Sequence, residues 1–147
     1  MANTSLDLIG IFNILYHHYG TQSWWPNDDS PFEICVGAIL TQGTAWRNVQ
    51  KALSELKSRT ILSPKSVDDL SLLDLASMIR SSGYFNQKAK KLKAFVNHLV
   101  TKHSAKLESM FEQPTEQLRR ELLSIYGIGQ ETADDIILFA AMQHTFV

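Results

Sequence analysis

A glycine-rich turn between two apolar segments is the feature that most constrains the fold of this chain. The turn is Gly127-Ile128-Gly129, and it is flanked by the apolar residues Leu122, Leu123, Ile125, Ile136, Ile137 and Phe139. Glycine suits backbone of positive φ or the close approach of another group. Because the second predicted helix begins just after Gly129, its free N–H groups and positive dipole end point out of the turn and form a site for an anion.

An ordinary αα-hairpin can contain the same turn, so two glycines alone do not distinguish a connection from a binding site. The longer pattern is L-x-x-I-x-G-I-G-x-x-T-A-D, beginning at Leu122. It resembles the helix-hairpin-helix, which grips a DNA phosphate with backbone amides. The pattern therefore favours a binding site over a simple connection.

Helical periodicity runs through almost the whole chain, and no segment alternates as a half-buried strand would. The apolar spacing predicts helices over residues 5–19, 31–42, 44–57, 71–81, 86–102 and 116–124, with a break at Ser63-Pro64 and a short turn at 107–111. Ser30-Pro31 is a typical helix start, and the run from Phe32 to Leu40 is apolar on nearly all sides. The predicted fold class is all-α, with a central buried helix.

Length and composition indicate one folded domain. The chain has 147 residues, of which 44% are hydrophobic and 20% charged, which is typical of a protein that buries a core. It contains no apolar run of membrane-spanning length and no leader-like N-terminus. The single cysteine, Cys35, excludes an intramolecular disulfide and a four-cysteine metal or iron–sulfur site within these residues. These features predict a cytoplasmic protein, nucleoid-associated if bacterial, with no membrane partner.

The charge is balanced overall but uneven along the chain. The net charge is −1, yet residues 84–107 contain no acidic side chain and six lysines, namely Lys88, Lys90, Lys91, Lys93, Lys102 and Lys106. Such a stretch is either a solvated helix face or a source of phosphate contacts, and the charges alone favour the solvated face.

Three ordered segments together resemble the endonuclease III superfamily of helix-hairpin-helix DNA glycosylases. They are Ala38-Ile-Leu-Thr-Gln-Gly-Thr44, Gly83-Tyr-Phe-Asn-Gln-Lys-Ala-Lys90 and the hairpin. The resemblance is closest in look to the 3-methyladenine DNA glycosylase subgroup. It implies an all-helical, two-lobed protein that grips DNA between its lobes and extrudes a damaged base into a pocket. Residues 1–22 would then belong to the second lobe, and residues 23–147 would form the helical-barrel domain with the hairpin at about 116–142.

The resemblance implies a set of DNA contacts. Gln42 would fill the gap left by the extruded base, because a side-chain amide can pair with any orphaned base. The alternative for Gln42 is a polar residue that ends a helix. The residues expected to hold the DNA backbone are Gly127, Ile128, Gly129 and Thr132, with help from Lys88, Lys90 and Lys91.

The three tryptophans are candidates for the base pocket. Trp24 and Trp25 lie in a loop before Pro26, and Trp46 follows the Gln42 loop. Aromatic faces stack on bases and attract cationic ones. A Trp-Trp-Pro opening resembles the 3-methyladenine subgroup, whose alkylated purines are positively charged. Packing in the core remains the alternative, and it is as strong as the pocket for Trp25.

The sequence departs from the family pattern at two catalytic positions. Glu131 stands where bifunctional members carry the Schiff-base lysine, so lysine-dependent lyase chemistry is not expected. The family's catalytic aspartate would fall just beyond Val147, so no catalytic residue is predicted within this chain, which is expected to be inactive alone. Asp134 and Asp135 are expected to face the helix dipole or solvent.

The prediction is therefore a part of a monofunctional glycosylase that removes alkylated purines from duplex DNA. The alternatives are a non-enzymatic helix-hairpin-helix DNA-binding module, a glycosylase for pyrimidine damage or mismatches, and a helical protein–protein module. We expect a monomer without a metal site, since the five histidines show no ligand spacing. No cofactor is expected in this chain beyond a monovalent cation that the hairpin carbonyls could hold, and an iron–sulfur cluster in a longer parent protein stays open.

Overall fold

The computed structural model describes residues 7–21, 30–59 and 62–146, and these ranges form helices and turns without a strand. The helices are α1 (Leu8–Tyr19), α2 (Pro31–Thr41), α3 (Trp46–Arg59), α4 (Pro64–Asp69), α5 (Leu72–Met78), η1 (Arg80–Ser82), α6 (Phe85–His103), α7 (Leu107–Phe111), α8 (Thr115–Leu123) and α9 (Gln130–Asp135), which continues into the π-helical turn η2 (Ile136–Ala140). The predicted all-α class is confirmed. No helix in the described ranges is both long and apolar enough to cross a bilayer.

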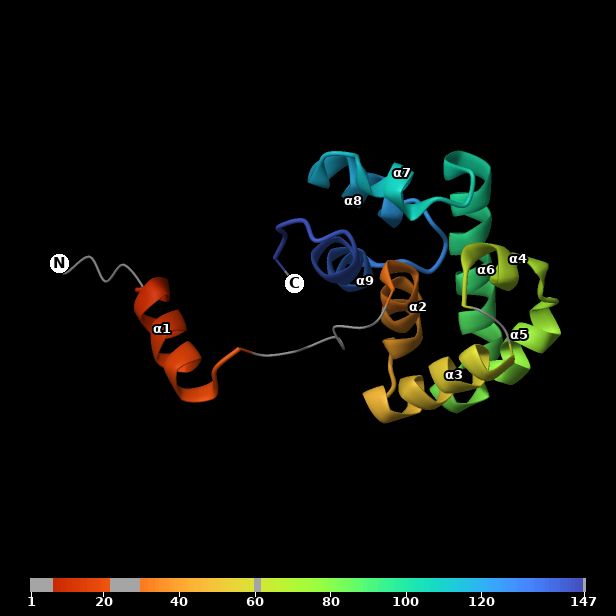
Figure 1. Ribbon diagram of the computed structural model, residues 1–147, viewed down its shortest axis with the longest axis horizontal. Helices are drawn as coiled ribbons and strands as arrows, with labels where there is room; N and C mark the ends of the chain where they lie inside the picture. The colour runs from red at the N-terminus through yellow and green to blue at the C-terminus, as the bar shows by residue number, and fades with distance from the viewer. Residues whose placement is uncertain (1–6, 22–29, 60–61, 147) are drawn as a thin grey trace.

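Helix α2 forms the centre of the core. The side chain of Ser30 accepts a hydrogen bond from the amide of Glu33 and starts the helix, with Pro31 at its first position. Every residue from Phe32 to Leu40 is buried, and α2 contacts α3, α6, α9 and η2. Figure 1 shows α2 between α9 and the arc of α3 to α6. The predicted buried central helix is confirmed.

The predicted break at Ser63-Pro64 lies between α3 and α4, but helix α4, which begins directly at this break, was not predicted. Ser63 accepts a hydrogen bond from the amide of Ser66 at 3.2 Å, and Ser66 returns the contact to the amide of Ser63 at 3.0 Å. This reciprocal capping starts a helix, and proline is tolerated at its first position. The helix predicted over 71–81 is divided into α5 and the short turn η1.

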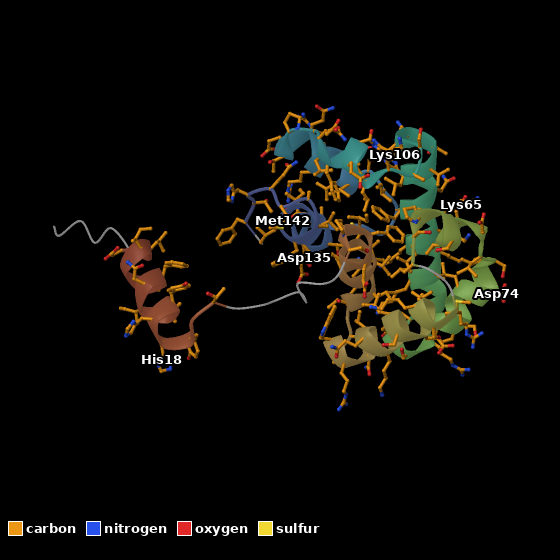
Figure 2. All side chains as sticks on the ribbon, in the orientation of Figure 1. His18, Lys65, Asp74, Lys106, Asp135 and Met142 are labelled. Atoms are coloured by element: carbon orange, nitrogen blue, oxygen red, sulfur yellow. The ribbon has the colours of Figure 1, made fainter. Side chains whose placement is uncertain are left out.

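Helix α1 lies apart from the other helices in Figure 1. The side chain of Asp7 caps its first turn, and none of its residues is buried. Its exposed apolar side chains are Leu8, Ile9, Ile11, Phe12, Ile14, Leu15, Tyr16 and Tyr19. His18 also projects from it in Figure 2. The assignment of this helix to a second lobe stays a prediction.

Lys88 is placed differently from the sequence prediction. Its side chain is 2% exposed, and its ammonium group donates to the carbonyls of Leu40 at 2.8 Å and Ser82 at 2.6 Å. Burial lowers the pKa of Lys88, and the nearby charge of Lys91 lowers it further. We therefore correct the predicted DNA contact, because a buried ammonium bonded to two carbonyls does not face a phosphate. Lys88 instead joins the end of α2 to the turn before α6.

We predict that Lys88→Met destabilises the protein by about 1–3 kcal/mol, since an apolar side chain of similar length leaves buried carbonyls without a donor. The free energy of unfolding would be measured by urea titration. Lys90→Met is the matched control, because Lys90 is exposed two residues further along the same helix and should change stability by no more than about 0.5 kcal/mol. Equal effects of the two substitutions would contradict the role given to Lys88.

Candidate nucleic-acid interface

The turn between α8 and α9 has the backbone that its glycines predicted. Gly127 has φ +84°, a backbone conformation that residues with a side chain rarely adopt. Gly129 has an extended backbone with φ −92° and directly precedes α9. The amide of Ile128 donates to the carbonyl of Ile125 at 3.1 Å, and the Ile128 side chain is buried in the core. Ile128 therefore anchors the turn from inside, and its own amide is already bonded.

The outer side of the turn offers free backbone donors. The first i→i−4 bond of α9 joins the amide of Ala133 to the carbonyl of Gly129 at 2.9 Å. The amides of residues 130–132 therefore have no acceptor within the helix. Gly129 is exposed, and a Cβ added to it would meet no atom within 4 Å. Another molecule can thus approach the backbone at this point.

Gln42 connects the end of α2 to this turn. Its side-chain nitrogen donates to the carbonyl of Gly127 at 3.0 Å and to the hydroxyl of Thr132 at 2.9 Å. Its side-chain oxygen accepts a hydrogen bond from the ammonium of Lys91 at 2.5 Å. The two donors and the oxygen of the amide all have protein partners, so Gln42 is held in one orientation beside the hairpin.

Lys91 reaches Gln42 by crossing over Gly127. A Cβ at position 127 would lie 2.3 Å from the Cγ and 2.6 Å from the Cδ of Lys91. Glycine is thus required at position 127 for its positive φ and also for the passage of the lysine stem. The role of Lys91 in holding Gln42 was not predicted, because its partner lies 49 residues away in the sequence.

The structure brings together four of the eight predicted DNA-binding residues through direct contacts, namely Gln42, Lys91, Gly127 and Thr132. Thr132 is buried and accepts from Gln42, so its hydroxyl is engaged within the protein. Trp46 is half-buried against the core at the start of α3. Trp24 and Trp25 lie outside the described residues, so their predicted role stays a prediction.

The three carboxylates of α9 have different surroundings. Asp134 is buried and accepts two hydrogen bonds from Arg119, at 2.7 and 3.0 Å, which corrects the expectation that it faces solvent or the helix dipole. Asp135, labelled in Figure 2, is half-buried. Burial raises the pKa of Asp135, and the charges of Glu131 and Asp134 raise it further. Glu131 is exposed at the surface of the first turn.

A family model for the HhH-GPD superfamily of base excision DNA repair proteins matches residues 36–147. The chain belongs to this superfamily. The match includes α2 from its second turn, the residues in contact with Gln42 and the whole hairpin. The resemblance based on three short segments is therefore confirmed.

A relative of known sequence supports the same assignment. A Methanocaldococcus jannaschii protein, assigned as a candidate DNA repair glycosylase, is 41% identical over 138 residues, which are 93% of this chain and 62% of that protein. The chain thus spans less than two thirds of this relative.

Two solved structures have similar folds. A crystal structure of H. pylori 3-methyladenine DNA glycosylase bound to 1,N6-ethenoadenine is similar with a TM-score of 0.74 and 29% identity, over 92% of this chain and 62% of that one. A non-covalent endonuclease III–DNA complex is similar in fold, with a TM-score of 0.73, 20% identity and coverage of 90% of this chain and 57% of that one.

We predict that Gly127→Ala destabilises the protein by about 1–3 kcal/mol, because alanine is strained at positive φ and its Cβ collides with the stem of Lys91. Urea unfolding would measure the loss. In the double variant Lys91→Ala/Gly127→Ala the collision with Cγ and Cδ is absent, so the two changes should be less than additive. Strict additivity would show that the lysine stem does not press on position 127.

Proposed function

We propose that this chain holds duplex DNA through the α8–α9 hairpin, as part of a monofunctional glycosylase that hydrolyses the N-glycosidic bond of damaged, alkylated purines. The contact of Gln42 with the hairpin carries the proposal. The side chain expected to fill the gap left by the extruded base is bonded to the turn expected to hold the DNA backbone, and pairing with the orphaned base would replace one or more of these bonds. One rigid unit would thus position both the phosphate and the gap in the duplex.

The proposed DNA contacts use the exposed side of the hairpin. The free amides of residues 130–132 and the positive end of α9 would meet a phosphate, and the bare backbone of Gly129 would allow it to come close. Lys90 is exposed on α6 and could add a phosphate contact. Lys88 is left out because it is buried. The partner is duplex DNA carrying damage, bound by one copy of the chain.

One similarity and one expectation from the sequence favour alkylated purines as substrates. The structure of the 3-methyladenine glycosylase with a modified adenine base is similar over 92% of this chain at 29% identity. The tryptophans Trp24, Trp25 and Trp46 would supply aromatic faces, which attract a cationic base more strongly than a neutral one.

Hydrolysis without strand cleavage is favoured by Glu131. A carboxylate cannot form the Schiff base on which lysine-dependent lyases depend. The carboxylate that stabilises the cationic sugar is proposed to follow Val147 in a longer protein. In that protein, helix α1 would belong to a second lobe. The chain of 147 residues would then bind DNA without releasing a base.

A monovalent cation at the turn carbonyls would add to the phosphate grip, although the carbonyl of Gly127 already accepts from Gln42.

We predict that Gly129→Ala weakens binding to duplex DNA at least tenfold while leaving the thermal midpoint of the protein unchanged. The free protein has room for this methyl group, but a closely approaching phosphate does not. Fluorescence anisotropy with a labelled duplex at several salt concentrations would measure the affinity and its salt slope. Ser77→Ala, an exposed change on α5, is the control and should bind as the unaltered chain does. Salt-independent binding, or equal binding by Gly129→Ala, would contradict the hairpin grip.

Base release provides the test of the catalytic proposal. Duplexes that contain 3-methyladenine or 1,N6-ethenoadenine would be incubated with this chain and with a longer form that includes the residues after Val147. We expect free base from the longer form only, and no strand cleavage until the abasic site is treated with alkali. Base release by the 147-residue chain would refute the missing-carboxylate proposal. DNA binding without base release by either form would support a non-enzymatic binding module.

A further inference from the structure

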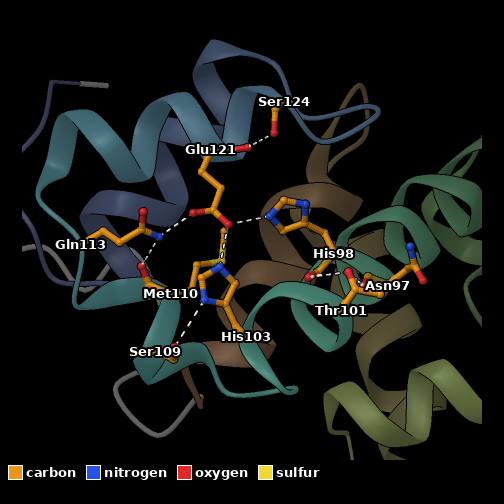
Figure 3. A network of polar contacts seen from close by, with 9 residues as sticks. All are labelled: Asn97, His98, Thr101, His103, Ser109, Met110, Gln113, Glu121 and Ser124. Atoms are coloured by element: carbon orange, nitrogen blue, oxygen red, sulfur yellow. Dashed lines mark hydrogen bonds and ion pairs between the residues drawn. The ribbon is translucent and has the colours of Figure 1, made fainter.

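Three side chains with metal-binding groups converge between the end of α6 and helix α8. Figure 3 shows His98 and His103 projecting from α6 toward Glu121 of α8. The Nε2 atoms of both histidines lie 2.6 Å from the same carboxylate oxygen, Oε1 of Glu121. One possible ligand atom from each of the three residues lies within 4.8 Å of the other two. The three side chains are only 12–18% exposed, so they are held in place by their surroundings.

Neighbouring groups orient the cluster. Gln113 donates to the other carboxylate oxygen of Glu121 at 2.5 Å and to the carbonyl of Met110 at 3.1 Å. This leaves Oε1 directed at the two imidazoles, as Figure 3 shows. The hydroxyl of Ser109 lies 3.4 Å from Nδ1 of His103, the ring nitrogen that faces away from Glu121. Metal-binding histidines and carboxylates are commonly held by such outer contacts.

The carboxylate is ionised at neutral pH. Burial acts to raise the pKa of Glu121, but hydrogen bonds from His103, His98 and Gln113 outweigh it and lower the pKa to about 2. In the metal-free protein the Nε2 protons face the negative Oε1, and a metal ion has to displace them to reach both nitrogens.

We propose that His98, His103 and Glu121 bind a divalent metal ion of the zinc class, with water as the fourth ligand. Imidazole and carboxylate suit Zn²⁺, and two histidines with one glutamate leave a tetrahedral position open. Ligand atoms around tetrahedral Zn²⁺ are about 3.3 Å apart, from bond lengths of about 2.0–2.1 Å. The two nitrogen–oxygen distances must therefore widen by roughly 0.7 Å, which small side-chain rotations can supply. The site is independent of the proposed glycosylase function.

Metal binding also has to account for protons. The lone pair of each Nε2 binds the metal, so any proton on that nitrogen is released and the neutral ring carries its proton on Nδ1. For His103 this proton would be donated to the hydroxyl of Ser109.

The cluster opens into a surface pocket that can hold the fourth ligand. The pocket has a volume of about 430 Å³ and is also lined by Lys102, Gln117, Arg120 and Ser124. The positive charges of Lys102 and Arg120 oppose a divalent cation. The affinity should therefore be lower than that of a closed site with four protein ligands. A bound ion would join the end of α6 to the first helix of the hairpin.

We expect the chelator-treated chain to bind one Zn²⁺ saturably in a calorimetric titration, and its thermal midpoint to rise by several degrees in the presence of Zn²⁺. Co²⁺ should give the visible absorption of a four-coordinate site. His98→Gln, His103→Gln and Glu121→Gln should each weaken Zn²⁺ binding at least tenfold. Ser109→Ala should weaken it by a smaller factor, because it removes only an orienting contact.

The controls separate this site from other histidines. The adjacent pair His17 and His18 on the exposed helix α1 is the main competitor, so His17→Gln/His18→Gln should bind Zn²⁺ as the unaltered chain does. Helical circular dichroism in chelator establishes that each variant folds, and any one folded ligand variant suffices for the test. Absence of saturable binding, binding unchanged in a folded ligand variant, or binding lost with His17 and His18 would overturn the proposal.

Discussion

Two lysines one turn apart on α6 hold the end of α2, and the geometry of the hairpin depends on them. Lys88 donates to the carbonyl of Leu40 inside the protein, and Lys91 donates to the side chain of Gln42 nearer the surface. The last carbonyls of a helix have no partner within it. Lys88 donates a hydrogen bond to one of these carbonyls, that of Leu40. Lys91 then orients Gln42, the residue that caps the end of α2. Without Lys91, the side-chain oxygen of Gln42 would lose its donor, and only the two bonds from its nitrogen would hold the side chain against the turn.

The hairpin joins the same arrangement from the other side. Gln42 bonds to the carbonyl of Gly127 and the hydroxyl of Thr132, while Ile128 anchors the turn in the core. Arg119 and Asp134 form a bidentate pair between α8 and α9, which fixes the angle between the two helices. The outer backbone of Gly129 is thus left free, while the rest of the turn is engaged within the protein. Such prior ordering lowers the entropy lost when a partner binds.

Features carried by local patterns could be predicted from the sequence, and features that depend on distant contacts could not. The apolar run in α2, the cap at Ser30 and the turn at Gly127–Gly129 each follow from neighbouring residues. Burial of Lys88 depends on carbonyls 6 and 48 residues away, so a lysine-rich helix suggested a surface instead. The partner of His98 and His103 is Glu121, 23 and 18 positions away, which is why their spacing alone suggested no metal site. Helix α4 was not predicted, although its capping pair, Ser63 and Ser66, is local.

The crossing of Lys91 over Gly127 has a consequence for how this family can vary. A side chain at position 127 and a long stem at position 91 compete for the same space, with a separation of 2.3 Å if both were present. Homologues that keep glycine in the turn can carry a lysine or another long residue at position 91. Those that lose the glycine need a shorter residue there and also lose the donor for Gln42. Positions 42, 91 and 127 should therefore change together during evolution, although 85 residues separate the first from the last.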